Sequence, residues 1–286
     1  MAAVPSYGLL MPVVPLVWDA QAARHAARLA TTGRRCTVAA DAGLEVVDVC
    51  PDRDLWAQPQ AGVGKGPGGG PPMSPFRTFT EQMTPGTVDP RFGLVGVAPR
   101  LVARVGPRAP SMGGLTADEA DPRDGVPWWS MRHVPLNGGA VLEPWVREVP
   151  DRPRVLVTLG TVVPTVVGTE VVSVLLDALA DLPVEVVLAL GDAAPARADG
   201  RPTNVRTAGS LPLSEALPTC RLIVHHGGSG TTAAPLHFGV PQLVLPSFAD
   251  HPLSAARVVE RGAGLSHDPT TLDVATARSL VLRPPL

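Results

Sequence analysis

The chain has 286 residues, 45% of them hydrophobic, and a formal net charge of -2 at pH 7. This length is enough to bury the core of one large domain or of two modest ones. There is no basic excess to neutralise the phosphates of a nucleic acid or to hold the chain on an anionic membrane, so the composition favours small-molecule chemistry.

In chain order, the first fifty residues alternate between helical and strand-like patterns. They predict a helix over residues 17–30, with Gly33 as the helix-terminating residue after it, and strands over residues 36–40 and 44–49. The apolar stretch over residues 8–18 lacks the basic start of a secretory signal, and no apolar run approaches the roughly 18 residues that span a bilayer. We therefore expect a small Rossmann-like domain at the start of a cytoplasmic protein.

Residues 59–150 are rich in glycine and proline, which predicts an irregular region without long helices or strands. Gly64, Gly66 and Gly69 have the spacing of a GxGxxG motif, but no strand precedes them and the prolines that follow exclude the helix of a dinucleotide site. Lys65 is followed by a glycine, so it is not a P-loop lysine. We interpret this segment as a flexible loop.

After Pro153, short β-branched runs alternate with helical segments, a pattern typical of a doubly wound α/β domain with a parallel sheet. The predicted strands cover residues 154–159, 184–190, 204–207, 222–225 and 242–245, and the predicted helices cover residues 171–182, 231–238, 252–261 and 272–280. The cysteines are widely separated and odd in number, so we interpret them as buried small side chains rather than as disulfide partners or metal ligands: Cys36, Cys50 and Cys220.

Residues 224–232 have the pattern of a strand, a glycine-rich turn and the start of a helix. Ligands of open parallel sheets bind beyond the carboxyl ends of the strands, where such turns lie. The glycines allow the backbone to approach a ligand, the helix start attracts a phosphate, and a histidine at the end of the strand adds a donor. The plainer alternative is a tight turn that only caps a helix, with His225 and His226 as partly buried polar residues.

The longer stretch over residues 224–264, VHHGGSGTTAAPLHFGVPQLVLPSFADHPLSAARVVERGAG, resembles the signature of family 1 glycosyltransferases. It is most similar to actinobacterial enzymes that attach deoxysugars to polyketide and related antibiotics. Residues 14–18, 131–145, 152–160 and 211–220 are similar to further segments of the same family. The resemblance implies a GT-B-like α/β fold of two Rossmann-like domains with parallel sheets. A shortened acceptor-type domain would cover residues 1–145, and a C-terminally truncated donor-binding domain would cover residues 146–286.

The resemblance also implies a set of site residues. It assigns the donor diphosphate to His225, Gly228, Ser229, Gly230 and Thr231, the donor sugar to Asp250 and His251, and a place in the cleft to Gly160 and Thr161. A carboxylate suits the sugar role because it can accept bonds from two hydroxyls. The nucleotide sugar would be a co-substrate, and the resemblance implies neither a metal nor another cofactor.

The chain departs from the family pattern at three positions. Leu9 occupies the place of the histidine that takes a proton from the acceptor hydroxyl, and leucine cannot act as a base. This leaves the catalytic residue unknown and predicts weakened activity, since general base catalysis is worth roughly 10²–10⁴-fold. Ser210 stands where an aromatic residue stacks on the nucleotide base, and His251 stands in place of a glutamine.

The sequence therefore predicts a nucleotide-sugar-dependent hexosyltransferase. It would move a deoxyhexose from a dTDP- or UDP-sugar to a hydroxyl of an apolar aglycone in antibiotic biosynthesis, as a monomer or in a homo- or hetero-oligomer, without nucleic acid or membrane insertion. The alternative is a non-catalytic remnant, or a partner protein of an active homologue. A nucleotide-sugar epimerase would need paired acid and base residues, and the sequence shows no such pair.

Overall fold

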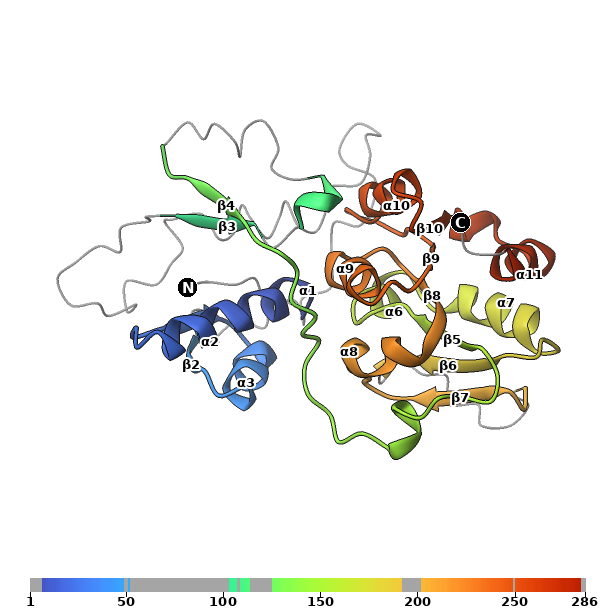
Figure 1. The fold of residues 1–286 in the computed structure, drawn as a ribbon, viewed down its shortest axis with the longest axis horizontal. Coiled ribbons are helices and arrows are strands. Elements are labelled where there is room, and N and C mark those ends of the chain that lie inside the picture. Colours follow the sequence, from blue (N-terminus) through green and yellow to red (C-terminus); the bar gives the residue numbers. More distant parts are fainter. Residues whose placement is uncertain are drawn as a thin grey trace. The chain divides into compact units, whose positions relative to one another are not determined.

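A computed structural model of the chain describes residues 7–48, 51, 103–106, 109–113, 125–191, 202–248 and 250–283. The chain forms two compact units (Figure 1). The first comprises Met1–Gly106 and Leu115–Trp129, and the second comprises Pro107–Gly114 and Ser130–Leu286. The glycines of the GxGxxG spacing, Lys65 and Cys50 lie outside the described residues.

The first unit contains a strand–helix–strand motif. Its described elements are α1 (Tyr7–Leu10), a 3-10 turn (Met11–Val13), α2 (Val14–Ala22), β1 (Arg28–Thr31), α3 (Arg34–Asp41), β2 (Glu45–Asp48), β3 (Arg104–Gly106) and β4 (Trp128–Ser130). β1 and β2 pair in parallel, with α3 as the crossover between them, while β3 and β4 form a separate two-stranded sheet. Leu10, Val14, Val17 and Leu29 are fully buried.

Two expectations for this unit were wrong. Residues 28–31 form a strand and not the end of a helix, because the helix stops at Ala22 and Arg24 adopts a left-handed conformation with φ of 63°. Residues 36–40 form part of α3 and not a strand. Their β-branched Thr37 and Val38 favour a strand locally, but two parallel strands require a crossover, which is usually a helix. The strand expected over residues 44–49 is confirmed as β2.

The second unit is built on a six-stranded sheet. The strands are β5 (Arg154–Thr158), β6 (Glu185–Ala189), β7 (Val205–Ala208), β8 (Cys220–His225), β9 (Gln242–Val244) and β10 (Gly264–Ser266). Their order is β10-β9-β8-β5-β6-β7, and every neighbouring pair is parallel. The chain winds outward from β5 in one direction through β6 and β7, and from β8 in the other, so the expected doubly wound α/β fold is confirmed.

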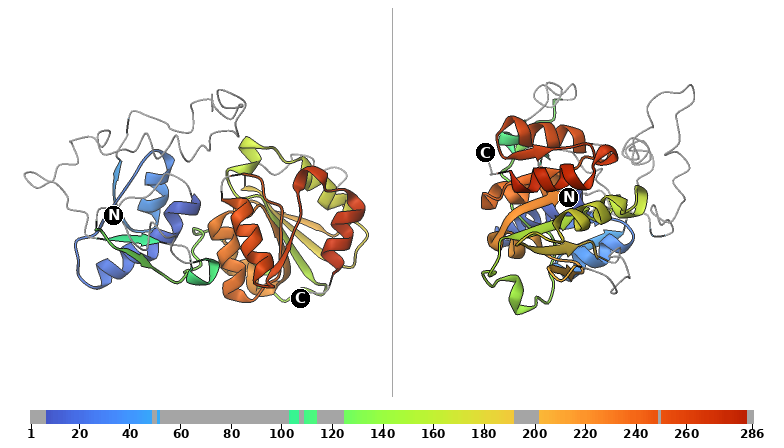
Figure 2. Two further views of the ribbon diagram at one scale, coloured as in Figure 1. Left: turned by 90° about the horizontal axis from the view of Figure 1, so that it is seen from above. Right: turned by 90° about the vertical axis from the view of Figure 1, so that its right-hand side faces the viewer.

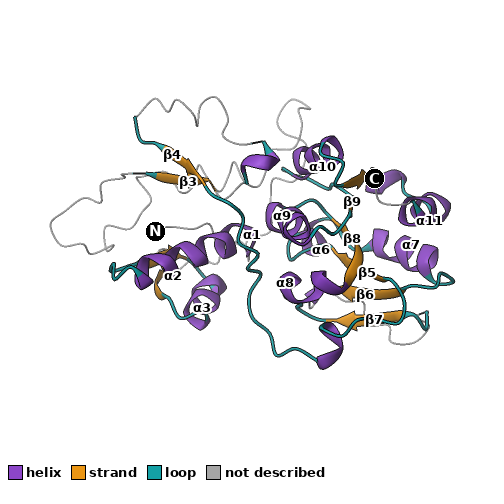
Figure 3. Cartoon of the chain, viewed as in Figure 1, coloured by secondary structure: helices purple, strands orange, loops and turns teal. Residues whose placement is uncertain are grey.

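Helices cover both faces of this sheet (Figures 2 and 3). They are α6 (Val163–Val166), α7 (Glu170–Leu179), α8 (Leu213–Ala216), α9 (Ser229–Phe238), α10 (His251–Glu260) and α11 (Val274–Leu282). Along β5, Val155 and Val157 pack in the core with α7 and α11, whereas Leu156 packs on the opposite face with α8 and α9. This alternation follows from the period of two in a strand, and burial on both faces explains why residues 155–157 of β5 are all apolar.

The five strands expected after Pro153 are all present, and the four expected helices begin and end within three residues of the predicted positions. The sequence reading missed β10, α6 and α8. Each has only three or four residues, too few for a hydrophobic period to be recognised.

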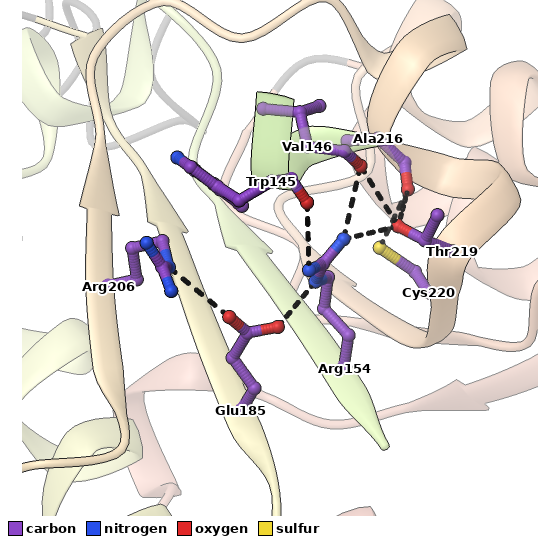
Figure 4. A network of polar contacts seen from close by, with 8 residues as sticks. All are labelled: Trp145, Val146, Arg154, Glu185, Arg206, Ala216, Thr219 and Cys220. Carbon is purple, nitrogen blue, oxygen red and sulfur yellow. Dashed lines mark hydrogen bonds and ion pairs between the residues drawn. The ribbon is translucent and has the colours of Figure 1, made fainter. Parts of the chain in front are cut away.

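A polar network lies at the amino end of β5 (Figure 4). Arg154 is 3% exposed, and its Nε donates to Glu185 Oε2 at 2.6 Å. Nη1 donates to the carbonyl of Val146 at 3.1 Å and to Thr219 Oγ1 at 2.5 Å, while Nη2 donates to the carbonyl of Trp145 at 3.2 Å. Every nitrogen of this buried guanidinium is therefore satisfied, and the network attaches the segment before β5 to the sheet.

Candidate functional site at the switch point of the sheet

The candidate site lies at the carboxyl ends of β5 and β8. These strands are neighbours, and the chain leaves them in opposite directions across the sheet. Such a switch point is where open α/β sheets bind their ligands. Gly160 follows β5, and the turn over residues 226–228 follows β8, so the expected turn and the expected cleft residues meet at this edge.

The turn after β8 leads into a helix start with open backbone amides. Gly227 has φ of +93°, and a Cβ there would lie 3.1 Å from the carbonyl oxygen of His251, so only glycine fits this close approach. α9 then begins at Ser229, with no side chain capping it. The amides of Ser229, Gly230 and Thr231 have no partner within the helix, and no acceptor among the described residues contacts them. A helix start in this state suits an anion.

His225 has a different role from the expected one. Its side chain is 0% exposed, Nε2 lies 2.8 Å from Gln242 Oε1, and Nδ1 accepts the backbone N–H of Gly227 at 3.1 Å. Burial lowers the pKa of this histidine to about 4, although the bond to Gln242 acts in the opposite direction. With both ring nitrogens engaged inside the protein, His225 has no free donor for the diphosphate contact that the resemblance implied. His225 instead holds the turn on β9.

His226 occupies the position between the two strand ends. A Cβ at Gly160 would lie 2.6 Å from Cε1 of this ring, and a Cβ at Gly228 would overlap its Nε2. The side chain is 8% exposed, and its pKa lies well below the usual range because of burial and of the neighbouring His251 and His225. The sequence analysis assigned no functional role to this histidine. Its position as the first residue beyond the strand was the signal that could have identified it.

The resemblance assigned Asp250 to the donor sugar. It is exposed at the start of α10, and its Oδ2 accepts the hydroxyl of Ser229 at 2.6 Å. This bond joins the starts of α9 and α10. Among the described residues, Oδ1 of Asp250 has no hydrogen-bond partner, so one carboxylate oxygen is available to a ligand.

His251 is buried and packs against His226 and Phe248. Its side chain is 6% exposed, and its ring lies 4.8 Å from the rings of both His226 and Phe248, measured between centroids. Nδ1 accepts the backbone N–H of Phe248 at 3.3 Å. Burial lowers its pKa, while Asp250 acts in the opposite direction. This packing favours support of His226 over the direct sugar contact that the resemblance implied.

The remaining expected positions are more peripheral. Gly160 has φ of +65° and its N–H donates to Thr158 Oγ1 at 3.2 Å, while Thr161 beside it is exposed. Ser210 is exposed after β7. Leu9 lies in α1, and its side chain is outside the described residues. Within the parts of the chain that the structure describes, no three His, Cys, Asp or Glu side chains are arranged to hold a metal ion.

Known proteins of the same fold identify the class. The glycosyltransferase SnogD from Streptomyces nogalater superposes with a TM-score of 0.71 at 29% identity, covering 98% of this chain and 89% of that one. SsfS6 of Streptomyces sp. SF2575, solved with thymidine diphosphate, gives a TM-score of 0.64 at 25% identity, covering 98% and 93%. Together with the switch-point site, these similarities define a glycosyltransferase of the GT-B fold.

Sequence comparison then gives the family. Two domain models described as erythromycin biosynthesis protein CIII-like match this chain, the C-terminal one over residues 173–283 and the N-terminal one over residues 112–160. The L-demethylnoviosyl transferase of Streptomyces niveus is 34% identical over 327 residues, covering 96% of this chain and 86% of the relative. The chain belongs to this family of antibiotic-pathway glycosyltransferases.

The chain is shorter than these relatives. The stretch aligned with the L-demethylnoviosyl transferase spans 327 residues, whereas the whole chain has 286. The relative therefore contains segments within the aligned region that this chain lacks. As for membranes, none of the helices among the described residues combines the length and the apolar character needed to cross one.

Proposed function

We propose that this chain transfers a deoxyhexose from a dTDP- or UDP-sugar to a hydroxyl of an apolar natural-product aglycone in antibiotic biosynthesis. The observation that carries the proposal is the start of α9 after the turn that follows β8: its first amides, of Ser229, Gly230 and Thr231, have no acceptor among the described residues, and His226 lies beside them between Gly160 and Gly228. Relatives named for demethylnoviosyl, mycaminosyl and desosaminyl transfer support the sugar class. The thymidine diphosphate in SsfS6 supports the nucleotide.

Each group at the site has a proposed role in this reaction. The amides of Ser229, Gly230 and Thr231 and the positive end of α9 hold the diphosphate and stabilise it as the leaving group, without a metal or another cofactor. His226, neutral and held between Gly160 and Gly228, presents a ring nitrogen at the same edge. The free oxygen of Asp250 accepts a sugar hydroxyl.

The reaction forms a bond between the acceptor oxygen and the anomeric carbon while the bond from that carbon to the diphosphate oxygen breaks. The acceptor proton must pass to a base, and this residue is unassigned, because Leu9 stands in its expected place. We further propose that residues 1–145 supply the acceptor side and residues 146–286 the donor side.

Calorimetric titration with dTDP and with UDP tests the donor site. We expect saturable binding by the wild-type chain and a loss of about 100-fold in affinity for Gly228→Ala, because the new Cβ overlaps His226 Nε2 at the phosphate turn. Gly209→Ala is the matched control: this glycine also follows a strand, but a Cβ there meets nothing within 4 Å. A folded wild-type chain that binds neither nucleotide would contradict the proposal.

The second candidate function is that of a non-catalytic relative or a partner of an active homologue, and Leu9 is the observation that favours it. A turnover assay with a panel of dTDP-sugars and aglycones separates the two. Release of dTDP that depends on an acceptor supports the enzyme. Tight dTDP binding, with no dTDP released from any dTDP-sugar in the presence of an acceptor, supports the non-catalytic role.

A further inference from the structure

The segment before β5 runs along α9. It has no regular secondary structure from residue 131 to residue 143. Its His133 is close enough to His237, in the last turn of α9, for that residue to contribute to lowering the pKa of His133, after the larger effect of burial. Asn137 lies at the opposite end of the helix: its Nδ2 is 4.0 Å from the position that a Cβ would take on Gly230. The segment therefore passes α9 in the antiparallel sense and brings Asn137 to the first turn.

The amide of Asn137 makes no hydrogen bond within the described chain. Its Oδ1 is buried and has no donor. Asn204 offers a contrast: its Oδ1 is also buried without a partner, but its Nδ2 donates to the carbonyls of Leu179, Leu182 and Val184, which fixes that side chain in the fold. A buried polar atom without a partner costs about 1–3 kcal/mol, so an amide with neither end engaged is unusual unless a ligand satisfies it.

We propose that Asn137 is a further donor-binding residue, whose Nδ2–H donates to a diphosphate oxygen held by the amides of α9 and whose Oδ1 accepts a hydroxyl of the donor sugar. This inference rests on the proposed function. An amide is suited to the junction between phosphate and sugar because it carries two N–H donors and a carbonyl acceptor on one group. Gly230 contributes no side chain here, so the space beside the first turn of α9 is shared by Asn137 and the ligand.

The test compares Asn137→Ala and Asn137→Asp with the wild-type chain, using dTDP and dTMP as probes in calorimetric titrations. Asn137→Ala should weaken dTDP binding about 10-fold, the effect of losing one hydrogen bond to a charged group. Asn137→Asp keeps the shape but places a carboxylate beside the diphosphate, so its loss should be larger, about 100-fold. Binding of dTMP should change by about twofold or less, because the outer phosphate is absent.

Gly139→Ala is the matched control on the same segment. Gly139 is exposed, lacks a positive φ, and a Cβ there meets nothing within 4 Å, so dTDP affinity should be unchanged. Thermal unfolding supplies the second readout. Because the Asn137 side chain makes no hydrogen bond with the described residues, its variants should unfold at the wild-type temperature, whereas a structural role would lower that temperature.

The outcomes separate the two proposals. If the wild-type chain binds dTDP and both Asn137 variants bind it equally well, the assignment of Asn137 is overturned and the proposed function stands. The assignment is also overturned if the variants unfold earlier while the ratio of dTDP to dTMP affinity stays constant. If the wild-type chain binds no dTDP, the proposed function itself fails.

Discussion

The polar network around Arg154 at the amino end of the six-stranded sheet and the polar groups at the start of α9, at its carboxyl end, differ in how many of their hydrogen bonds are made. At the amino end, every nitrogen of Arg154 has an acceptor, supplied by Glu185, Thr219 and the backbone of residues 145 and 146. At the carboxyl end, the first amides of α9 and the amide of Asn137 have no partner among the described residues. The difference teaches that burial or charge alone does not mark a site: the Arg154 network is saturated and stabilises the fold, whereas the candidate site lies where polar groups at a switch point have no partner among the described residues.

The largest effect on stability is expected from disrupting the Arg154 network at the amino end of β5. Arg154→Met should lower the free energy of unfolding by about 3–5 kcal/mol, because it leaves Glu185 and the surrounding carbonyls without their buried partner. Urea denaturation measures this change. The folded variant should bind dTDP as tightly as the wild-type chain, since Arg154 lies at the opposite end of β5 from the amide turn.

Arg206→Met is the control, because Arg206 pairs with the same Glu185 at 3.2 Å but is 48% exposed. Exposed pairs are worth about 0–1 kcal/mol, so its effect should be small. A large loss of dTDP affinity in Arg154→Met would show that the two ends of the sheet are coupled. It would contradict the view that the Arg154 network only stabilises the fold.

The buried histidines at the carboxyl end of the sheet should make the stability of the chain depend on pH. His225 titrates at a pKa of about 4 in the folded chain against 6.5 ordinarily, so between these values the unfolded state binds a proton that the folded state does not. Stability should be complete above pH 6.5 and fall as the pH drops toward 4, by up to about 3 kcal/mol from this residue.

Urea denaturation across this range measures the slope. His225→Asn should be less stable at neutral pH, but its stability should depend less on pH between 6.5 and 4. The slope should not vanish, because the pKa values of His226 and His251 are also lowered. An unchanged slope would mean that His225 is not held neutral by the fold.

Removing the Asp250 carboxylate should have a smaller effect, which is limited to the reaction of the dTDP-sugar and does not extend to dTDP binding. Asp250→Ala should lower kcat/KM for a dTDP-sugar about 10-fold, while dTDP affinity stays unchanged because dTDP lacks the hydroxyls that the carboxylate accepts. Glu260→Ala, at the far end of the same helix, is the control. Equal losses for dTDP and for the dTDP-sugar would place Asp250 on the diphosphate instead.

The smallest effect concerns a second turn of similar form in the first unit. β1 is followed by Thr32, Gly33 and α3, but here Asp48 occupies the turn: its carboxylate accepts Thr32 Oγ1 at 2.7 Å and the N–H of Gly33 at 3.4 Å. Asp48→Ala should destabilise the chain by about 1 kcal/mol, measured by urea denaturation, and leave dTDP affinity unchanged. A new dTDP site in this variant would show that only the carboxylate distinguishes the two turns.

Much of the second unit could be predicted from its sequence, because its strands are buried on both faces and their apolar runs are unmistakable. The first unit was harder. α3 contains the β-branched Thr37 and Val38, and β1 directly follows a short helix, so local propensity pointed to the wrong elements there. The pairing of β1 with β2 decided the outcome, and that contact joins residues far apart in the chain.

The amino-acid sequence by itself determined the doubly wound sheet, the glycine turn after β8 and the family, because hydrophobic period and motif are local properties of the chain. Only the tertiary structure decided which of two adjacent histidines lies between Gly160 and Gly228 at the switch point. His225, at the end of the strand, is held by Gln242 of β9, and His226, one residue later, is released toward Gly160. The tertiary structure also brought Asn137 to the first turn of α9, since the partners of a side chain depend on how distant segments pack.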